Sequence, residues 1–221
     1  MTDRLKINVD PTEFDIRVSY LPHLLGADSN PTTRSYEDIV NDFLMNSIYG
    51  TVVAEARKIK DKAALQEFKN HRPSVIAQSV VKGGVDKKDI ILINNIVKVD
   101  VDLESAPLVE VVFPVVKMLF GKFALAIYRS ISGRGLQIDI LIDDPAKKDA
   151  YYDKITATLK SHHIPVDDCF KSVVQKSVLS FDSNGFFNTD PVAFTGTVDA
   201  EIEKQVRELT GRKQKSNRQK D

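Results

Sequence analysis

The chain has 221 residues, and its 31 Lys and Arg residues balance its 31 Asp and Glu residues, so its formal net charge at pH 7 is zero. A neutral chain offers no global electrostatic attraction to nucleic acid or to a membrane, and any basic surface must therefore be local. The single cysteine, Cys169, excludes an intramolecular disulfide and argues against a zinc site built from cysteines. No apolar run approaches the ~20 residues of a membrane span, and the N-terminus lacks the apolar core of a signal peptide, so we expect a cytoplasmic location.

Residues 1–89 are expected to form an N-terminal α/β module that packs on a core domain. The stretch "LKINVDPTEFDIRVSYLP" alternates well enough to predict one or two short strands. Residues 36–69 carry helical spacing, with Ser35 as the N-cap, and Gly50 is expected to divide this segment into two helices. "SVIAQSVV" then predicts a strand.

Residues 90–200 predict the core. "IILINNIVKVDVD" is a strand interrupted near Asn94 and Asn95, "SAPLVEVVFPVVKMLFGK" a helix, and "FALAIYRSI" and "LQIDILID" are strands joined by the turn "SGRG". A helix in "PAKKDAYYDKITATLKSHH" and a strand in "KSVLSFD" complete the order β-α-β-β-α-β. This RRM-like, split βαβ order predicts an α+β fold with an antiparallel sheet, both helices on one face and the first strand between the third and the fourth. Residues 201–221 predict a C-terminal helix, ending near Gly211, and a basic, disordered tail.

Two carboxylates, Asp100 and Asp102, lie at the end of an apolar strand. Residues two apart on a strand share a face, roughly 6–7 Å apart. At an effective dielectric constant of about 20, two unit charges at that separation repel by roughly 2–3 kcal/mol. A divalent cation such as Mg²⁺ or Mn²⁺ would remove this repulsion. The alternative is a pair of acids on a solvent-exposed strand end.

The turn in "SISGRGLQ" has two interpretations. It can be a hairpin that needs glycine where the backbone requires a positive φ. It can also present a concave row of backbone N–H groups from Ser132 to Gly135 that holds a phosphate, with Arg134 supplying charge and Ser132 a hydroxyl. Asp182 ends the fourth predicted strand, and it can reach the other two acids only if that strand continues or is offset.

The order "VDVD", "SGRGLQ" and "SFDSNGFFNTDPVAF" resembles the three motifs of the archaeo-eukaryotic primase, or primase-polymerase, superfamily. More narrowly it is similar to the VirE N-terminal-type domain of bacteria and their mobile elements, and "FKNHRPSVIAQSVVKGG" matches the lead-in of that domain. The resemblance covers roughly residues 63–194. It implies a nucleotidyltransferase that acts in DNA replication on a single-stranded DNA template, with RNA as another candidate template.

The resemblance also implies which residues carry the chemistry. Asp100, Asp102 and Asp182 would be catalytic and would hold two Mg²⁺ or Mn²⁺ ions, which clamp the attacking and departing oxygens. Contacts to the triphosphate of the incoming nucleotide would come from five residues: Ser132, Gly133, Arg134, Gly135 and Gln137. No Walker motif is present, so a helicase-like ATPase would act from another chain.

The chain departs from the superfamily at three positions, one of which is the third motif, where Asp182-Ser183 stands in place of the usual Asp-Pro. Gln137 stands where many active relatives have a histidine, and Gln175 stands where a basic residue is expected; glutamine carries no charge. The alternative is therefore a catalytically degenerate, primase-like module that binds nucleic acid or a replication partner. A metal-dependent nuclease is a third interpretation, since nucleases also use paired acids.

Overall fold

The computed structural model describes residues 4–8, 16–25 and 30–218, with side chains through residue 210. The strands are β1 (Arg17–Leu21), β2 (Thr32–Ser35), β3 (Ser74–Ile76), β4 (Ser79–Val81), β5 (Ile90–Ile93), β6 (Ile96–Asp102), β7 (Ala124–Arg129), β8 (Gly135–Leu141), β9 (Ser177–Val178) and β10 (Phe186–Phe187). The helices are α1 (Tyr36–Ile39), which continues as a π-helical turn (Val40–Leu44), α2 (Ser47–Lys58), α3 (Lys62–Asn70), α4 (Ala106–Phe120), α5 (Lys148–Ser161) and α6 (Ala200–Arg218). Short 3-10 turns lie at Lys87–Asp89, Pro145–Lys147 and Asp168–Lys171.

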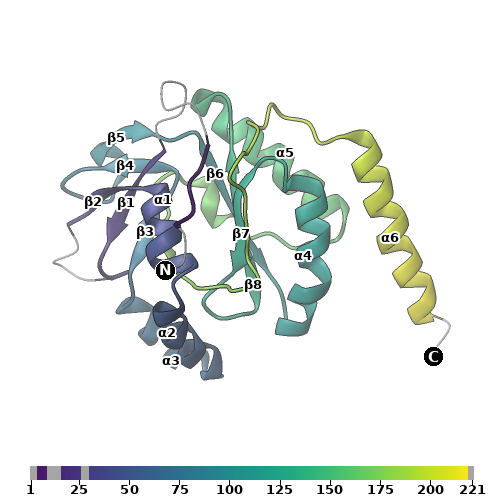
Figure 1. Ribbon diagram of the computed structural model, residues 1–221, viewed down its shortest axis with the longest axis horizontal. Coiled ribbons are helices and arrows are strands. Elements are labelled where there is room, and N and C mark those ends of the chain that lie inside the picture. Colours follow the sequence, from purple (N-terminus) through teal and green to yellow (C-terminus); the bar gives the residue numbers. More distant parts are fainter. Residues whose placement is uncertain (1–3, 9–15, 26–29, 219–221) are drawn as a thin grey trace.

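An antiparallel sheet in the order β10-β7-β8-β6 lies at the centre of the molecule (Figure 1). β6 pairs with β8 along its whole length, from Ile96 opposite Leu141 to Asp102 opposite Gly135. One face of this sheet packs against both α4 and α5, and these elements together form the largest hydrophobic core. The opposite face packs against α1, with Tyr36 and Ile39 buried there. The α+β class and the placement of both helices on one face are therefore confirmed.

The fourth predicted strand does not join this sheet. β9 pairs with β3 and completes a second sheet in the order β2-β1-β3-β9, while Leu179 is buried against the α1-covered face of the central sheet. The prediction that the first strand lies between the third and the fourth is wrong, because Ser177 and Val178 pair with β3 in the second sheet instead of with β6. The other edge of β6 meets an isolated bridge between Asp100 and Asp167 and the side chain of Gln78, whose Oε1 accepts from the backbone N–H of Lys98 (3.3 Å).

The boundary predicted at residue 89 is crossed by strand pairing. The predicted interruption at Asn94 and Asn95 is present, and it lets β5 pair with β4 while β6 enters the central sheet. Together with the pairing of β3 with β9, this pairing means that the N-terminal part and the core contribute strands to the same sheets.

The helices before β3 end at other positions than the sequence predicts. Ser35 caps α1 as expected, since its hydroxyl accepts a hydrogen bond from the backbone N–H of Asp38. The breaks fall at Asn46 and Asp61, whose side chains cap α2 and α3. Gly50 lies inside α2, so its prediction as a break is wrong: a Cβ there would come within 2.7 Å of the ring of Phe181, and glycine leaves room for that ring.

A fully buried polar network joins α1 to the central sheet. The ammonium of Lys98 on β6 donates to Asp139 Oδ1 on β8 (2.9 Å) and to the hydroxyl oxygen of Tyr128 on β7 (2.8 Å). The hydroxyl of Tyr36 donates to Asp139 Oδ2 (2.6 Å). The side chains of Lys98 and Asp139 are 1% and 2% exposed, so this ion pair is shielded from solvent.

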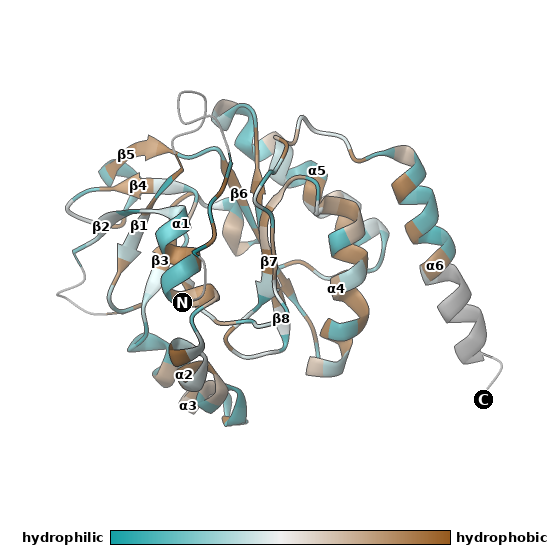
Figure 2. Ribbon diagram, viewed as in Figure 1, coloured by the Kyte–Doolittle hydropathy of each residue, from teal (hydrophilic) through white to brown (hydrophobic). Residues whose placement is uncertain are grey.

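The C-terminal helix packs on the outside of α4 (Figure 1). α4 is apolar over most of its length, whereas α6 is mostly polar and buries Val206 against the core (Figure 2). α6 continues to Arg218, beyond the predicted end at Gly211, because Lys, Arg and Gln favour helix. Residues 219–221 of the predicted tail lie outside the described residues. Across the described residues, none of the helices has the combined length and apolar character that crossing a membrane requires.

Replacing Lys98 with Met should lower the free energy of unfolding by about 3–5 kcal/mol, because the variant leaves the carboxylate of Asp139 buried without its cation. Urea unfolding monitored by circular dichroism would measure the loss. Lys58→Met is the matched control: Lys58 forms an exposed pair with Glu55, and such pairs contribute less than about 1 kcal/mol. Equal stabilities of Lys98→Met and Lys58→Met would contradict the prediction.

Candidate functional site

The two carboxylates of the first motif lie where β6 meets the turn between β7 and β8. In the register of β6 with β8, Asp100 lies opposite Gln137 and Asp102 lies opposite Gly135. One residue further on, the backbone N–H of Leu103 donates to the carbonyl of Arg134 (2.9 Å). The structure therefore brings the acids and the glycine turn together.

Asp100 is the most perturbed acid of this site. Burial raises the pKa of its carboxyl to about 7, and repulsion from Asp102 and then Asp167 adds to the rise, while Lys98 and Lys69 oppose it. Asp100 Oδ1 is buried and has no hydrogen-bond partner among the described residues. A buried carboxylate oxygen without a donor is costly unless a proton or a cation satisfies it. The position therefore fits a cation ligand.

The turn that follows β7 is closely packed against β6. Gly133 has a φ of +72°, a conformation that favours glycine. A Cβ at Gly135 would lie 2.5 Å from the carbonyl oxygen of Val101, so the absence of a side chain there allows the acids and the turn to approach closely. Both glycines are thus required by the backbone.

Two of the N–H groups in the predicted row, those of Gly133 and Arg134, are not free. The backbone N–H of Gly133 donates to the carbonyl of Ser130 (2.9 Å), and that of Arg134 donates to Ser132 Oγ (3.3 Å). These bonds close the turn on itself, so a phosphate at this position would depend mainly on charged side chains. The guanidinium of Arg134 has no ion pair among the described residues and is available for that role.

Gln137 and Gln175 line the same cavity as the acids. Gln137 is buried, and its side-chain oxygen accepts a hydrogen bond from Ser177 Oγ (2.9 Å). Because this bond occupies the side-chain oxygen of Gln137, its amide nitrogen remains as a donor. The residue can therefore offer a neutral hydrogen bond to a ligand.

Asp182 does not join the other two acids. Its Oδ2 accepts from the backbone N–H of Arg129 (2.9 Å) and its Oδ1 from that of Asn184 (3.1 Å), at the edge of β7 that faces away from β8. β6 lies two strand spacings away from β7, or about 10 Å. The three-acid cluster predicted from the sequence is therefore absent. No group of three or more His, Cys, Asp or Glu residues that could hold a metal ion occurs within the part of the chain that the structure describes.

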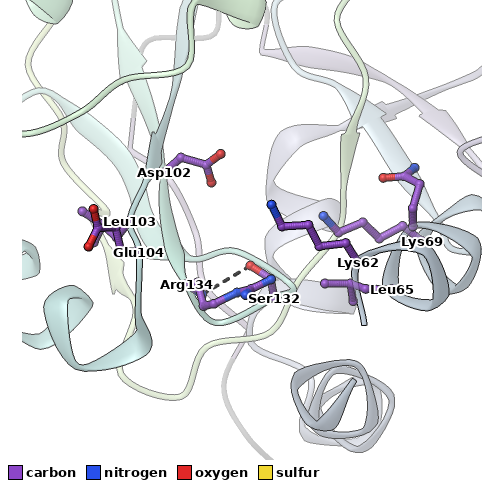
Figure 3. A pocket seen from close by; sticks show the side chains of 9 residues that line it. Lys62, Leu65, Lys69, Asp102, Leu103, Glu104, Ser132 and Arg134 are labelled. Atoms are coloured by element: carbon purple, nitrogen blue, oxygen red, sulfur yellow. Dashed lines mark hydrogen bonds between the residues drawn. The ribbon is translucent and has the colours of Figure 1, made fainter. Parts of the chain in front are cut away.

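The acids open into a cleft between α3 and the β7–β8 turn. Two adjoining cavities of about 590 and 440 Å³ share Asp102, Ser132 and Lys69. In Figure 3, the carboxylate of Asp102 and the ammonium groups of Lys62 and Lys69 point toward one another across this cleft. Paired acids on one wall and lysines on the other suit a ligand that carries both phosphates and a divalent cation.

Three residues of the cleft escape sequence reasoning. Lys62 and Lys69 are seven residues apart on α3, which places both on one helix face, but nothing in the sequence says that this face meets β6. Asp167 pairs with Asp100 through the backbone, its N–H donating to the Asp100 carbonyl (2.9 Å). The Asp167 side chain caps the following 3-10 turn by accepting from the N–H of Cys169 (2.9 Å), and such a cap is the one signal the sequence carries.

The raised pKa of Asp100 predicts a pH-dependent stability. The folded state holds the Asp100 proton up to about pH 7 and the unfolded state loses it near pH 4, so between these values the folded state binds more protons and stability falls as pH rises. Asp100→Asn removes this dependence, and its stability relative to wild type should increase by roughly 2–3 kcal/mol from pH 5 to pH 8. Urea unfolding of both proteins at the two pH values measures the difference, and parallel pH profiles would contradict the assignment.

In comparisons with models of known protein families, with curated proteins and with solved structures, nothing matches this chain.

Proposed function

We propose that the chain is a primase-polymerase-like nucleotidyltransferase that uses Mg²⁺ or Mn²⁺ and nucleoside triphosphates on a single-stranded template. The observation that carries the proposal is Asp100 Oδ1, which is buried without a hydrogen-bond partner beside Asp102, in a cleft whose other wall presents Lys62 and Lys69. The resemblance of "VDVD" and "SGRGLQ" to the superfamily motifs supports the same function.

Two carboxylates suffice for this role when the ligand brings its own oxygens. Mg²⁺ is commonly held by one or two protein carboxylates together with substrate phosphates and waters, and Asp100 and Asp102 match that pattern. When bound, the cation supplies charge that stabilises the attacking and leaving oxygens of phosphoryl transfer. Because Asp182 lies away from the site, Asp100 and Asp102 would hold one such ion, rather than the two that three acids would hold.

The residues of the chain then divide the remaining work. Lys62, Lys69 and Arg134 attract and orient the triphosphate, because they are the cations that line the cavity of about 590 Å³ beside Asp102. Gln137 positions the ligand through one neutral hydrogen bond. Burial raises the pKa of Asp100 to about 7, and a cation binds the ionised form, so activity should rise as pH increases toward 7.

Asp100→Ala and Asp102→Ala should each lower primer synthesis or extension by roughly 100-fold or more, since metal-ion stabilisation of the transition state is worth several kcal/mol. The assay uses a single-stranded template, labelled nucleotides and either Mg²⁺ or Mn²⁺, with deoxyribonucleotides and ribonucleotides tested separately. Glu208→Ala is the control, an exposed carboxylate on α6 away from the cleft. Full activity of Asp100→Ala would remove the proposed ligand from the mechanism.

A second candidate is a degenerate, primase-like module that binds nucleic acid or a replication partner without catalysis. Two observations favour it: Asp182 lies outside the site, and Gln137 provides no charge. Calorimetry separates the two functions. The catalytic proposal predicts triphosphate binding that requires Mn²⁺ and weakens in Lys62→Ala and Lys69→Ala, whereas the degenerate module predicts no heat from either ligand.

A further inference from the structure

We propose that the cavity on the far side of the β7–β8 turn is a second phosphate site, which holds the sugar–phosphate backbone of a single-stranded nucleic acid. This cavity has a volume of about 480 Å³ and is lined by neither Asp100 nor Asp102. The inference rests on the proposed function for the class of its ligand. The residues that line the cavity are not the ones proposed to hold the cation.

The charge of this cavity is strongly positive in a chain whose net charge is zero. Arg57, Lys60, Arg129 and Arg134 line it, against a single carboxylate, Glu104. Arg129 is paired with Glu110 and lies 3.9 Å from Asp182, but Lys60 and Arg134 have no ion pair among the described residues. An anion in the cavity would offset the repulsion among these cations.

Arg57, one of the lining residues, is held in place beside the cavity. Its Nη2 donates to the carbonyls of Phe181 (2.9 Å) and Ser130 (3.4 Å), and its aliphatic stem lies over Gly133, where a Cβ would come within 3.2 Å of Cδ. The other two guanidinium nitrogens have no hydrogen bond to the described residues. Burial lowers the pKa of Arg57, with Arg129 lowering it further and Asp182 opposing the change, as expected for a cation in a crowded basic cavity.

The N-terminus of α4 lies at the same position and adds one backbone donor. Ser105 and Ala106 line the cavity, and the Ser105 side chain makes no capping hydrogen bond. Pro107 has no backbone N–H, and that of Leu108 donates to the Ser105 carbonyl (3.2 Å). Within these first three residues of the 15-residue helix, only Ala106 therefore offers a backbone N–H to an anion.

The shape of the surface favours a polymer over a free triphosphate. Ser132 lines all three cavities and Arg134 lines two of them, so the groove runs from the acids, over the turn, to the far side. A triphosphate bound at the acids occupies one end of this groove, and only a longer chain of phosphates occupies both. No aromatic side chain lines the far cavity, so it should bind the backbone rather than stack bases, with little dependence on sequence.

Lys60 is the residue to test, because it is exposed and makes no contact that the fold needs. Binding of fluorescein-labelled (dT)12 and (dA)12 is measured by anisotropy in EDTA, without nucleotide, over a range of salt concentrations. Lys60→Ala should weaken binding of both by about three- to tenfold and flatten the slope of log K against log salt by about 0.7, and Lys60→Glu should weaken it more. Lys58→Ala and Lys58→Glu are the matched controls at the end of α2, outside the cavity, and should bind as the wild type does.

Three results would overturn the proposal: no binding of either oligonucleotide by the wild type, equal effects at Lys58 and Lys60, or unchanged binding in the Lys60 variants. Competition with inorganic tripolyphosphate distinguishes a site for free polyphosphate from a site for the nucleic-acid backbone. If the Lys60 variants lose tripolyphosphate binding but keep oligonucleotide binding, the cavity holds free polyphosphate and the proposal is overturned. Primer extension by the wild type is measured separately. If the wild type is inactive but binds oligonucleotides through Lys60, only the proposed function is rejected. If the wild type is active but its oligonucleotide binding does not depend on Lys60, only the second site is rejected.

Discussion

The pairing of β6 with β8 is the interaction on which the candidate site depends. Its register places Asp100 and Lys98 on the face that α1 covers and places Val97, Val99 and Val101 on the face that α4 and α5 cover. A register shift by one residue would exchange the two sets: Lys98 and Asp100 would face the apolar core under α4 and α5, and the three valines would leave it. The burial of the valines therefore selects the observed register. The same register brings Gly135 against Asp102, so the core and the site are specified by one ladder of hydrogen bonds.

The two charges that β6 buries are treated differently. Lys98 is satisfied by Asp139 and Tyr128, and it stabilises the contact between α1 and the sheet. Asp100, two residues further on, has no such partner for Oδ1. Since both lie on the same strand and the same face, the unsatisfied position reflects the open cleft beside it rather than poor packing of the fold.

Sequence reasoning succeeded where the periodicity of the elements and their order along the chain decide the outcome. The β-α-β-β-α-β order places the end of the first strand beside the turn between the second and third strands, and it thereby predicts that Asp100, Asp102 and the turn meet. The position of Asp182 could not be predicted, because β9 is two residues long and its apolar neighbours can be buried against either sheet. The role of Gly50 and the place of the α3 lysines in the cleft could not be predicted for a related reason. Gly50 lies against Phe181, and the α3 lysines lie across from β6, so both contacts join segments far apart in the chain.

The buried bond from Tyr36 to Asp139 has a consequence for how the groove meets a ligand. Hinged closure of the N-terminal elements over the central sheet would have to separate Tyr36 from an ion pair that is shielded from water, and Arg57 would have to leave the carbonyls of Phe181 and Ser130. The walls are thus preorganised at one width. Ligands of different size would then be accommodated by changes in the rotamers of the long lysine side chains. The backbone of the groove would keep the same width with and without a ligand.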